Sequence, residues 1–256
     1  SLQALDGPDC LPDIEKATQR IAQAIIEREH ILLAVDFDAD GTSAGAVLTI
    51  ALRDVFGHPA DRVHYFAGHR QRDGYGVSDT LTDRIIASGL APALVVTADQ
   101  GANNHATVTR LAQAGIQTVV TDHHEMSHPP VDAVACVSPA RDDSIFPDPH
   151  IAGAHVAWLV CCAVRTHLIK VGHLPPQTPR LGSLMDIVSV AAVADCSSLG
   201  RSRNNRAVVL HGTAMMNACP RPAWQAFKEV VPRIKRFDAG TLGWTISPMI
   251  NAASRI

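Results

Sequence analysis

An apolar segment that ends abruptly in three aspartates constrains this chain more than any other feature. Residues 31–35 read ILLAV, and Asp36, Asp38 and Asp40 follow at every second position before Gly41. A short apolar run predicts a buried strand, and carboxylates buried at its end cost free energy unless a cation or hydrogen-bond donors compensate them. Like charges this close repel by roughly 1–4 kcal/mol per pair, depending on the local dielectric. The segment therefore predicts a divalent metal site at the end of a strand.

Short apolar segments alternate with segments of helical periodicity through the first 137 residues. We expect strands at 31–35, 62–67, 93–98, 116–121 and 133–137, and helices at 12–29, 43–56, 78–88 and 104–114. Such alternation is typical of βαβ units, whose parallel sheet is covered on both faces. Further helices are expected at 151–169, 184–193, 205–216 and 222–231. The predicted fold class is α/β, a five-stranded mainly parallel sheet with helices on both faces, followed by a helical C-terminal half.

Composition limits the classes of protein that fit. No apolar run approaches the roughly 20 residues that cross a bilayer, and the first ten residues, SLQALDGPDC, lack a signal-peptide pattern. None of the six cysteines belongs to a C-x-x-C pair, which favours reduced thiols over disulfides or zinc. We therefore expect a cytoplasmic protein without membrane contact.

Charge is distributed unevenly along the chain. Residues 201–256 contain nine Lys and Arg against two Asp and Glu, which leaves 13 against 23 in residues 1–200. A basic final part beside an acidic remainder suits a metal site that faces a polyanion such as nucleic acid. Ordinary surface charge explains the asymmetry equally well.

Polar residues also follow two further predicted strands. Asp99 comes after 93–98, and Asp122, His123 and His124 come after 116–121. Ligands of an open α/β sheet bind outside the carboxyl ends of its strands, so we expect these side chains to meet the three aspartates. Carboxylates with imidazole suit Mn²⁺ and Mg²⁺, whereas zinc more often has Cys or several His. The number of carboxylates indicates two ions, an arrangement that hydrolyses phosphoesters.

Four segments in order carry a family resemblance: VDFDADGTSAGAVL, VVTADQG, TDHHE and VAAVADCSSL. They resemble the four motifs of the DHH phosphoesterase superfamily, and within it the branch of RecJ-like single-stranded-DNA-specific exonucleases. Segments at 69–78, 151–158, 204–209 and 247–256 match the same branch in place. The resemblance implies one DHH catalytic domain over 1–256, with a sheet half at 1–140 and a mostly helical half at 150–256. It also implies that the family's smaller C-terminal DHHA1-type domain is absent from this chain.

The resemblance assigns a metal-binding or catalytic role to each matching residue. The implied ligands of two Mn²⁺ or Mg²⁺ ions are Asp38, Asp40, Asp99, His123 and Asp195, with Asp36 as a further acid. Without the resemblance, the end of a helix is the favoured interpretation of Asp195. Asp99 is the expected bridge between the ions, and Asp122 is expected to orient His123. The implied catalytic residues are His124, which would contact the scissile phosphate, Asp99 and Arg255.

The matching segments also imply a set of substrate contacts: Arg70, Gly153, His155, Arg206, Asn251, Ser254 and Arg255. Gly153 could instead permit close helix–sheet contact, and His155 could lie on the surface. Asn103 and Asn104 are expected to cap the helix at 104–114. The family pattern is broken at three places, because Ala34 replaces a histidine of some relatives, Met249 an arginine and Ser254 a glycine.

The sequence thus predicts a metal-dependent enzyme that hydrolyses phosphodiester bonds in single-stranded DNA, in the 5′-to-3′ direction according to the resemblance. One alternative is a small-substrate phosphodiesterase that acts on short oligoribonucleotides or cyclic dinucleotides. Another is a catalytically silent scaffold with the same fold. The expected partner is a single-stranded nucleic acid, and protein partners or downstream domains would help to grip the strand.

Overall fold

A parallel sheet forms the centre of the chain, as the alternation of apolar and helical segments predicts. The computed structural model describes residues 5–218 and 220–254. The strands are β1 (Ile31–Val35), β2 (Val63–Ala67), β3 (Leu94–Ala98), β4 (Gln117–Thr121) and β5 (Ala135–Val137). Their order in the sheet is β2-β1-β3-β4-β5, and all four pairings are parallel. The predicted α/β class is confirmed, and all carboxyl ends of the strands meet at one edge.

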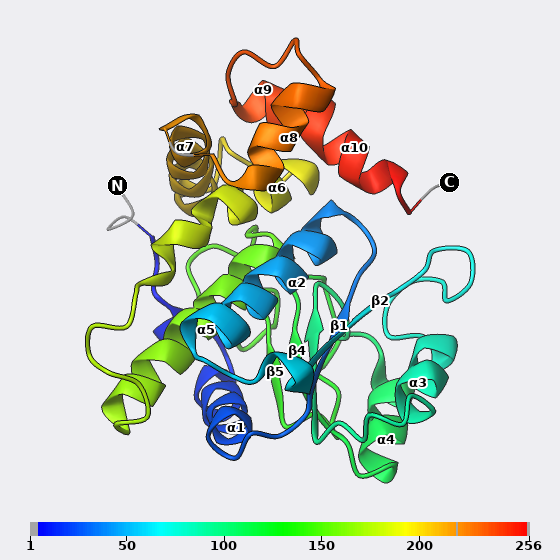
Figure 1. Cartoon of the computed structure of the whole chain (residues 1–256). Coiled ribbons are helices and arrows are strands. Elements are labelled where there is room, and N and C mark those ends of the chain that lie inside the picture. Colours follow the sequence, from blue (N-terminus) through cyan, green and yellow to red (C-terminus); the bar gives the residue numbers. More distant parts are fainter. Residues whose placement is uncertain (1–4, 219, 255–256) are drawn as a thin grey trace.

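Helices cover both faces of this sheet (Figure 1). On one face lie α1 (Ile14–Ile26), α2 (Ala39–Ile50) and α5 (Gly153–Lys170), and on the other lie α3 (Asp79–Ile86) and α4 (His105–Gln113). The side chains of β1 alternate between the two cores: Leu33 and Val35 join the first, whereas Leu32 and Ala34 join the second. Burial on both faces explains why β1 is continuously apolar rather than alternating.

The chain from α6 onward forms a helical lobe beyond the carboxyl ends of the strands (Figure 1). It contains α6 (Met185–Ala194), α7 (Arg203–Ala218), α8 (Pro222–Val230), α9 (Ala239–Thr241) and α10 (Ser247–Ala252), with a π-helical turn at Leu242–Ile246. Buried Asp186 of α6 accepts hydrogen bonds from Arg221 (2.6 Å) and from the indole of Trp224 (2.7 Å). These bonds fix α8 on α6, and α6 in turn packs against α2 and α5, which cover the sheet.

The helix after β1 differs from its prediction at both ends. It begins at Ala39 rather than Ser43, because the side chain of Asp38 accepts hydrogen bonds from the backbone N–H groups of Asp40 and Gly41. This N-cap places Asp40 in the first helical turn. The helix continues after Ile50 as a π-helical turn at Ala51–Val55. Short 3-10 turns occupy Pro8–Cys10, Ala60–Arg62 and Leu181–Leu184.

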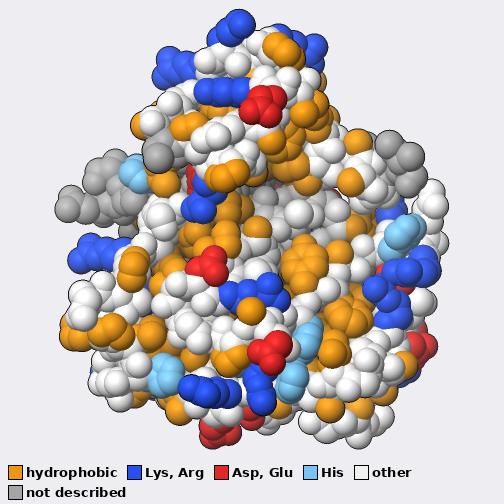
Figure 2. All heavy atoms as spheres, viewed as in Figure 1, with side chains coloured by type: hydrophobic (Ala, Val, Ile, Leu, Met, Phe, Trp, Pro, Cys, Tyr) orange, Lys and Arg blue, Asp and Glu red, His pale blue; other side chains and the backbone are white. Residues whose placement is uncertain are grey.

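The described helices and the surface show where apolar and basic residues lie. None of the helices in the described part of the chain is long and apolar enough to span a bilayer. Several Lys and Arg side chains project from the upper helical lobe in Figure 2. Arg233, Lys235 and Arg236 of this lobe are exposed, so part of the basic C-terminal charge faces solvent.

Candidate metal centre

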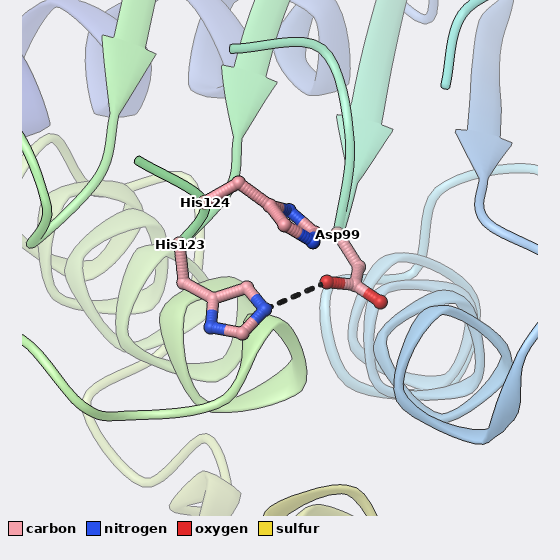
Figure 3. Close-up of side chains that lie close together, drawn as sticks. All are labelled: Asp99, His123 and His124. Carbon is pink, nitrogen blue, oxygen red and sulfur yellow. Dashed lines mark ion pairs between the residues drawn. The ribbon is translucent and has the colours of Figure 1, made fainter. Parts of the chain in front are cut away.

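Carboxylates and imidazoles from four segments converge at the carboxyl edge of the sheet. Asp36, Asp38 and Asp40 follow β1, Asp99 follows β3, and His123 and His124 follow β4. Asp195 comes from the C-terminal end of α6. Figure 3 shows the imidazole of His123 pointing at the carboxylate of Asp99, with His124 beside them. The predicted meeting of the strand ends is therefore present, and the helical lobe contributes the last acid.

His123 lies at the centre of the cluster. Its Nε2 atom is 3.1 Å from Asp99 Oδ1, 3.7 Å from Asp40 Oδ2 and 4.0 Å from Asp195 Oδ2. Three sets of possible ligand atoms each lie within 4.8 Å of one another: Asp99, His123 and His124; Asp40, His123 and Asp195; and Asp36, Asp38 and Asp99. Asp99 belongs to two of these sets, as a residue shared between two neighbouring ions would.

Backbone N–H groups hold the two carboxylates at the start of α2. Asp38 Oδ1 accepts from the N–H of Asp40 (2.9 Å) and of Gly41 (3.0 Å). Asp40 Oδ2 accepts from Gly153 N–H (2.7 Å), and Oδ1 accepts from Ala154 N–H (2.7 Å). The positive N-terminal end of α5 thus compensates part of the charge of a carboxylate that is almost completely buried.

Asp99 is held in a conformation that few residues adopt without support. Its φ is 61°, in the left-handed region, which costs of order 1–3 kcal/mol for a residue other than glycine. Gly153 packs against it, since a Cβ added to Gly153 would lie 2.6 Å from Asp99 Oδ1. The close contact leaves the Asp99 side chain little room to move away from His123.

The electrostatics of the cluster favour a bound cation. Burial raises the pKa of both Asp36 and Asp40 to about 6. Burial, together with the neighbouring Asp40 and Asp38 carboxylates, raises the pKa of Asp99 well above its usual range. Burial also raises the pKa of Asp195. The carboxylates resist ionisation beside one another, and a divalent cation would relieve that repulsion.

Two buried atoms at the centre match the chemistry of a metal ligand. Asp99 Oδ1 and His123 Nε2 are buried and face each other at 3.1 Å, but neither atom makes a hydrogen bond among the described residues, although buried polar atoms without one are rare in folded proteins. A carboxylate oxygen and an imidazole nitrogen are ligands that Mn²⁺ accepts. The residues present fit the expected ions, and Asp36, Asp38, Asp40, Asp99, His123 and Asp195 are placed to hold them.

Asp122 orients His124, and the prediction that it orients the His123 ring is wrong. Its Oδ1 lies 2.7 Å from His124 Nδ1 and accepts from the His123 backbone N–H (2.7 Å). The hydrogen bond to Asp122 raises the pKa of His124 to about 9. Burial acts to raise the pKa of Asp122, but the hydrogen bond and charge of His124 outweigh it and lower that pKa. In the metal-free protein His124 is therefore protonated at neutral pH, and it lies beside the candidate metal ligands.

Gly153 and His155 do not present the substrate contacts that were expected of them. The N–H of Gly153 donates to Asp40, so it is not free for a phosphate, and the close approach to Asp99 is the feature that requires glycine. His155 is 0% exposed, which excludes both a substrate contact and a surface position. Burial lowers the pKa of His155 to about 4, and its ring packs edge-on against Trp158.

The remaining predicted substrate residues surround the centre without a demonstrated ligand contact. Arg70 donates to the Tyr75 hydroxyl (2.7 Å), and its guanidinium lies 5.8 Å from the centroid of the Phe37 ring. Asn251 Oδ1 accepts from the Ala39 N–H (2.7 Å) and so ties α10 to the start of α2. Their roles in substrate binding stay predictions.

Three predicted residues belong to the helical lobe or the chain end. Arg206 donates to the carbonyls of Leu199 (2.7 Å) and Gly200 (2.9 Å), and thereby holds the loop after Asp195. The Ser254 hydroxyl donates to the Asn251 carbonyl (2.9 Å). Arg255 lies outside the described residues.

Asn103 and Asn104 connect the loops of the site, although the sequence suggested helix capping. Asn104 occupies the N-cap position of α4 but makes no side-chain cap bond. Its Oδ1 accepts from the Val77 N–H (3.1 Å), and Asn103 donates to the carbonyl of Glu125 (2.8 Å). The two adjacent asparagines after a glycine were the sequence signal that could have indicated this role. Their hydrogen-bond partners, however, lie more than 20 residues away, and only the tertiary fold brings them together.

The fold and the ligand set together define an open α/β metal-binding domain with an oxygen-rich centre at its strand ends. The chain belongs to the DHH family: residues 30–188 match the DHH family, N-terminal domain. This match covers the sheet and most of the metal residues, and Asp195 lies just beyond it.

The relatives and solved structures most useful for comparison carry one name. The chain is 34% identical over 252 residues to the "Single-stranded-DNA-specific exonuclease RecJ" of Escherichia coli (strain K12), covering 96% of this chain and 42% of that protein. The chain is also 34% identical over 262 residues to the protein of that name from Dickeya dadantii, covering 100% of this chain and 44% of that protein. The chain thus spans less than half the length of these curated relatives.

Two metal-bound crystal structures resemble this one over nearly the whole chain. One is described as exonuclease RecJ bound to manganese, with a TM-score of 0.80, 29% identity, and coverage of 98% of this chain and 59% of the other. The other is RecJ from Thermus thermophilus in complex with Mn²⁺, with a TM-score of 0.74, 28% identity, and coverages of 96% and 33%.

Proposed function

We propose that this chain is the catalytic domain of a metal-dependent exonuclease that hydrolyses phosphodiester bonds in single-stranded DNA. The observation that carries the proposal is the convergence of five carboxylates and two histidines at the strand ends of a DHH domain. Likeness to proteins named as single-stranded-DNA-specific exonucleases supports the substrate class, and the 5′-to-3′ direction is proposed from the resemblance of the sequence motifs alone. Mn²⁺ or Mg²⁺, as two ions, fits the ligand set.

The ions, when bound, polarise the phosphate and lower the pKa of the attacking water. The residues that would hold them are Asp38, Asp40, Asp99, His123 and Asp195, and Asp36 would add negative charge beside Asp38. Asp122 orients the His124 imidazole and raises its pKa, and this side chain would stabilise the negative charge that develops on the phosphate oxygens. Hydrolysis forms a bond from water oxygen to phosphorus and breaks the bond from phosphorus to the 3′ oxygen of the terminal nucleotide.

Arg70 and Tyr75 form the entrance on one side of the centre. The guanidinium and the phenol are joined by a hydrogen bond, and the Tyr75 side chain is 67% exposed. A cation next to an exposed aromatic ring suits a nucleotide, because the first pairs with phosphate and the second stacks on a base. We also propose that the protein is cytoplasmic, since the five described cysteines are free.

Substrate choice tests this function. We expect Mn²⁺-dependent release of mononucleotides from 5′-phosphorylated single-stranded DNA, little attack on the same sequence as a duplex, and no reaction with chelator. Asp99→Asn should abolish the reaction with the fold retained, whereas Asp142→Asn, a change at an exposed aspartate outside the centre, should not.

Two results would replace the proposal with an alternative. Degradation of a dinucleotide but not of longer strands would identify a small-substrate phosphodiesterase. Tight Mn²⁺ binding without turnover of any strand would identify a catalytically silent domain.

A further inference from the structure

Two cavities adjoin one another on the side of the metal centre that faces the helical lobe. The first, of about 600 Å³, is lined by His123 and Asp195 of the centre and by His150 and Arg201. The second, of about 520 Å³, shares His150, Arg201 and Pro149 with the first and extends to Arg203. The shared walls make one groove that leads away from the metal ions; we call it the Arg201 groove.

The side chains of this groove suit a phosphate backbone. Arg201 is exposed, and its guanidinium forms no hydrogen bond or ion pair within residues 5–218 and 220–254. Ser197 and Ser198 add hydroxyl groups to the wall, and His150 adds an imidazole. Arg203, by contrast, is already paired with Asp6 at 2.5 Å. Arg201 is thus the cation in this groove that has its full charge available for a ligand.

Four acidic side chains line the groove, and three of them already have a hydrogen-bond, ion-pair or proposed metal partner. Asp148 accepts hydrogen bonds from Ser202 and Asn204, and Asp6 pairs with Arg203. Asp195 is one of the metal ligands proposed above. Glu125 remains as an exposed carboxylate of the first cavity. A polyanion would avoid this carboxylate and follow the wall that carries Arg201.

The loop that carries Arg201 is held in place before any ligand binds. Arg206 binds the carbonyls of Leu199 and Gly200, and the Arg201 N–H donates to Ser198 Oγ (3.1 Å). Ser202 N–H in turn donates to the Ser198 carbonyl (3.2 Å). A fixed loop lowers the entropy cost of ordering the protein when a ligand binds. It also fixes the position of Arg201 relative to the metal centre.

The opposite side of the centre offers much less space. A separate cavity of about 360 Å³ is lined by Asp36, Asp99 and His124 together with Tyr75 and Asn104. That volume lies near the lower end of the range for a ligand of drug size, the size class of one nucleotide. A polymer cut at the metal centre therefore has more open space along the Arg201 side than on the Tyr75 side.

We propose that the Arg201 groove binds the sugar–phosphate backbone of the strand that continues beyond the scissile phosphate, with Arg201 as its phosphate contact. The inference rests on the proposed nuclease function and adds the path of the polymer to it. Phosphate contacts fix the register of a strand without reading its sequence, so the groove would be indifferent to base identity.

Kinetics on two substrate lengths test the phosphate contact. Arg201→Gln should raise the KM for a 5′-phosphorylated decanucleotide roughly five- to tenfold more than the KM for a dinucleotide, because only the longer strand reaches the groove. The slope of log KM against log salt should fall by about 0.7, the value for one phosphate contact on a single strand. Arg28→Gln is the control: Arg28 is exposed beside the opposite edge of the sheet, and neither quantity should change. Equal effects of Arg201→Gln on both lengths would overturn the proposal.

A chemical footprint tests the same groove without relying on turnover. Cys196 lines the first cavity and is exposed. A phosphorothioate decanucleotide should slow the reaction of Cys196 with a maleimide, followed on the Cys196 peptide by mass spectrometry, at least fivefold in Mn²⁺. If the reaction rate of Cys196 is unchanged although fluorescence anisotropy shows that the oligonucleotide is bound, the strand binds outside the Arg201 groove. If the wild type degrades no DNA but Cys196 is protected, the nuclease function fails and the groove stands as a nucleic-acid site.

Discussion

Gly153→Ala should weaken metal binding through a single added methyl group. The new Cβ would lie 2.6 Å from Asp99 Oδ1 and 2.7 Å from Asp99 Cβ, distances at which one of the two residues must move. Asp99 already has a φ of 61°, and the N–H of Gly153 is bonded to Asp40, so the clash would displace either the candidate ligand Asp99 or the residue that holds the candidate ligand Asp40. Overpacking of a close-packed site costs about 1–3 kcal/mol.

If that strain is relieved by displacing Asp99 or Asp40, the affinity for Mn²⁺ falls by about 5- to 150-fold. Isothermal titration calorimetry measures the affinity, and urea unfolding of the metal-free protein measures the stability of the fold. Gly7→Ala is the matched control, because a Cβ at Gly7 meets no atom within 4 Å. If Gly153→Ala binds Mn²⁺ as tightly as Gly7→Ala does, the steric reasoning is refuted, whatever the stability of the Gly153→Ala variant.

Three further outcomes follow from the charges of the site and the core. Asp122→Asn should return the pKa of His124 from about 9 toward the ordinary value near 6.5. The variant should also hydrolyse substrate roughly 100-fold more slowly at pH 8. NMR titration of the imidazole measures the pKa, and a value still near 9 would contradict the prediction. Protons compete with metal at Asp36 and Asp40, whose raised pKa of about 6 means that both carboxyls become protonated as pH falls through 6. Mn²⁺ affinity measured by calorimetry should therefore drop steeply below pH 6, and a flat profile from pH 7 to 5 would count against the ligand assignment. His155→Leu should reduce the loss of stability in acid. The pKa of His155 is about 4 in the folded protein and ordinary in the unfolded chain, so the unfolded chain binds more protons as pH falls from about 6.5 to 4. Removing this group should raise the free energy of unfolding at pH 4, measured in urea, by up to about 3 kcal/mol, and an unchanged pH dependence would refute the prediction.

The sequence predicts most of the sheet and part of the site, because both depend on local pattern. Each apolar run became a strand, and the polar residues directly after β1, β3 and β4 meet because parallel strands end at one edge. Asp195 is different. Its segment reads as the end of a helix, which it is, and placing it beside His123 required knowing how α6 packs over the sheet. The family resemblance supplied that information.

The errors arose where a polar group had several possible partners. Asp122 is adjacent in sequence to His123, but the turn after β4 brings its side chain to the ring of His124. The N–H groups that open α5 suit a phosphate in isolation, yet in the folded chain they bind Asp40. His155 belongs to a helix whose first residues lie under the sheet edge, so it is buried rather than facing substrate. Partner choice of this kind depends on tertiary packing.

Metal location tests the central claim most directly. A crystal of this protein soaked in Mn²⁺ and measured at the manganese absorption edge gives the position of every ion by anomalous scattering. We predict two adjacent manganese peaks that share Asp99. One of them should contact His123 with Asp40 or Asp195, and the other should contact Asp38. No peak among these residues, or ions bound elsewhere while Asp99 faces an empty site, would contradict it.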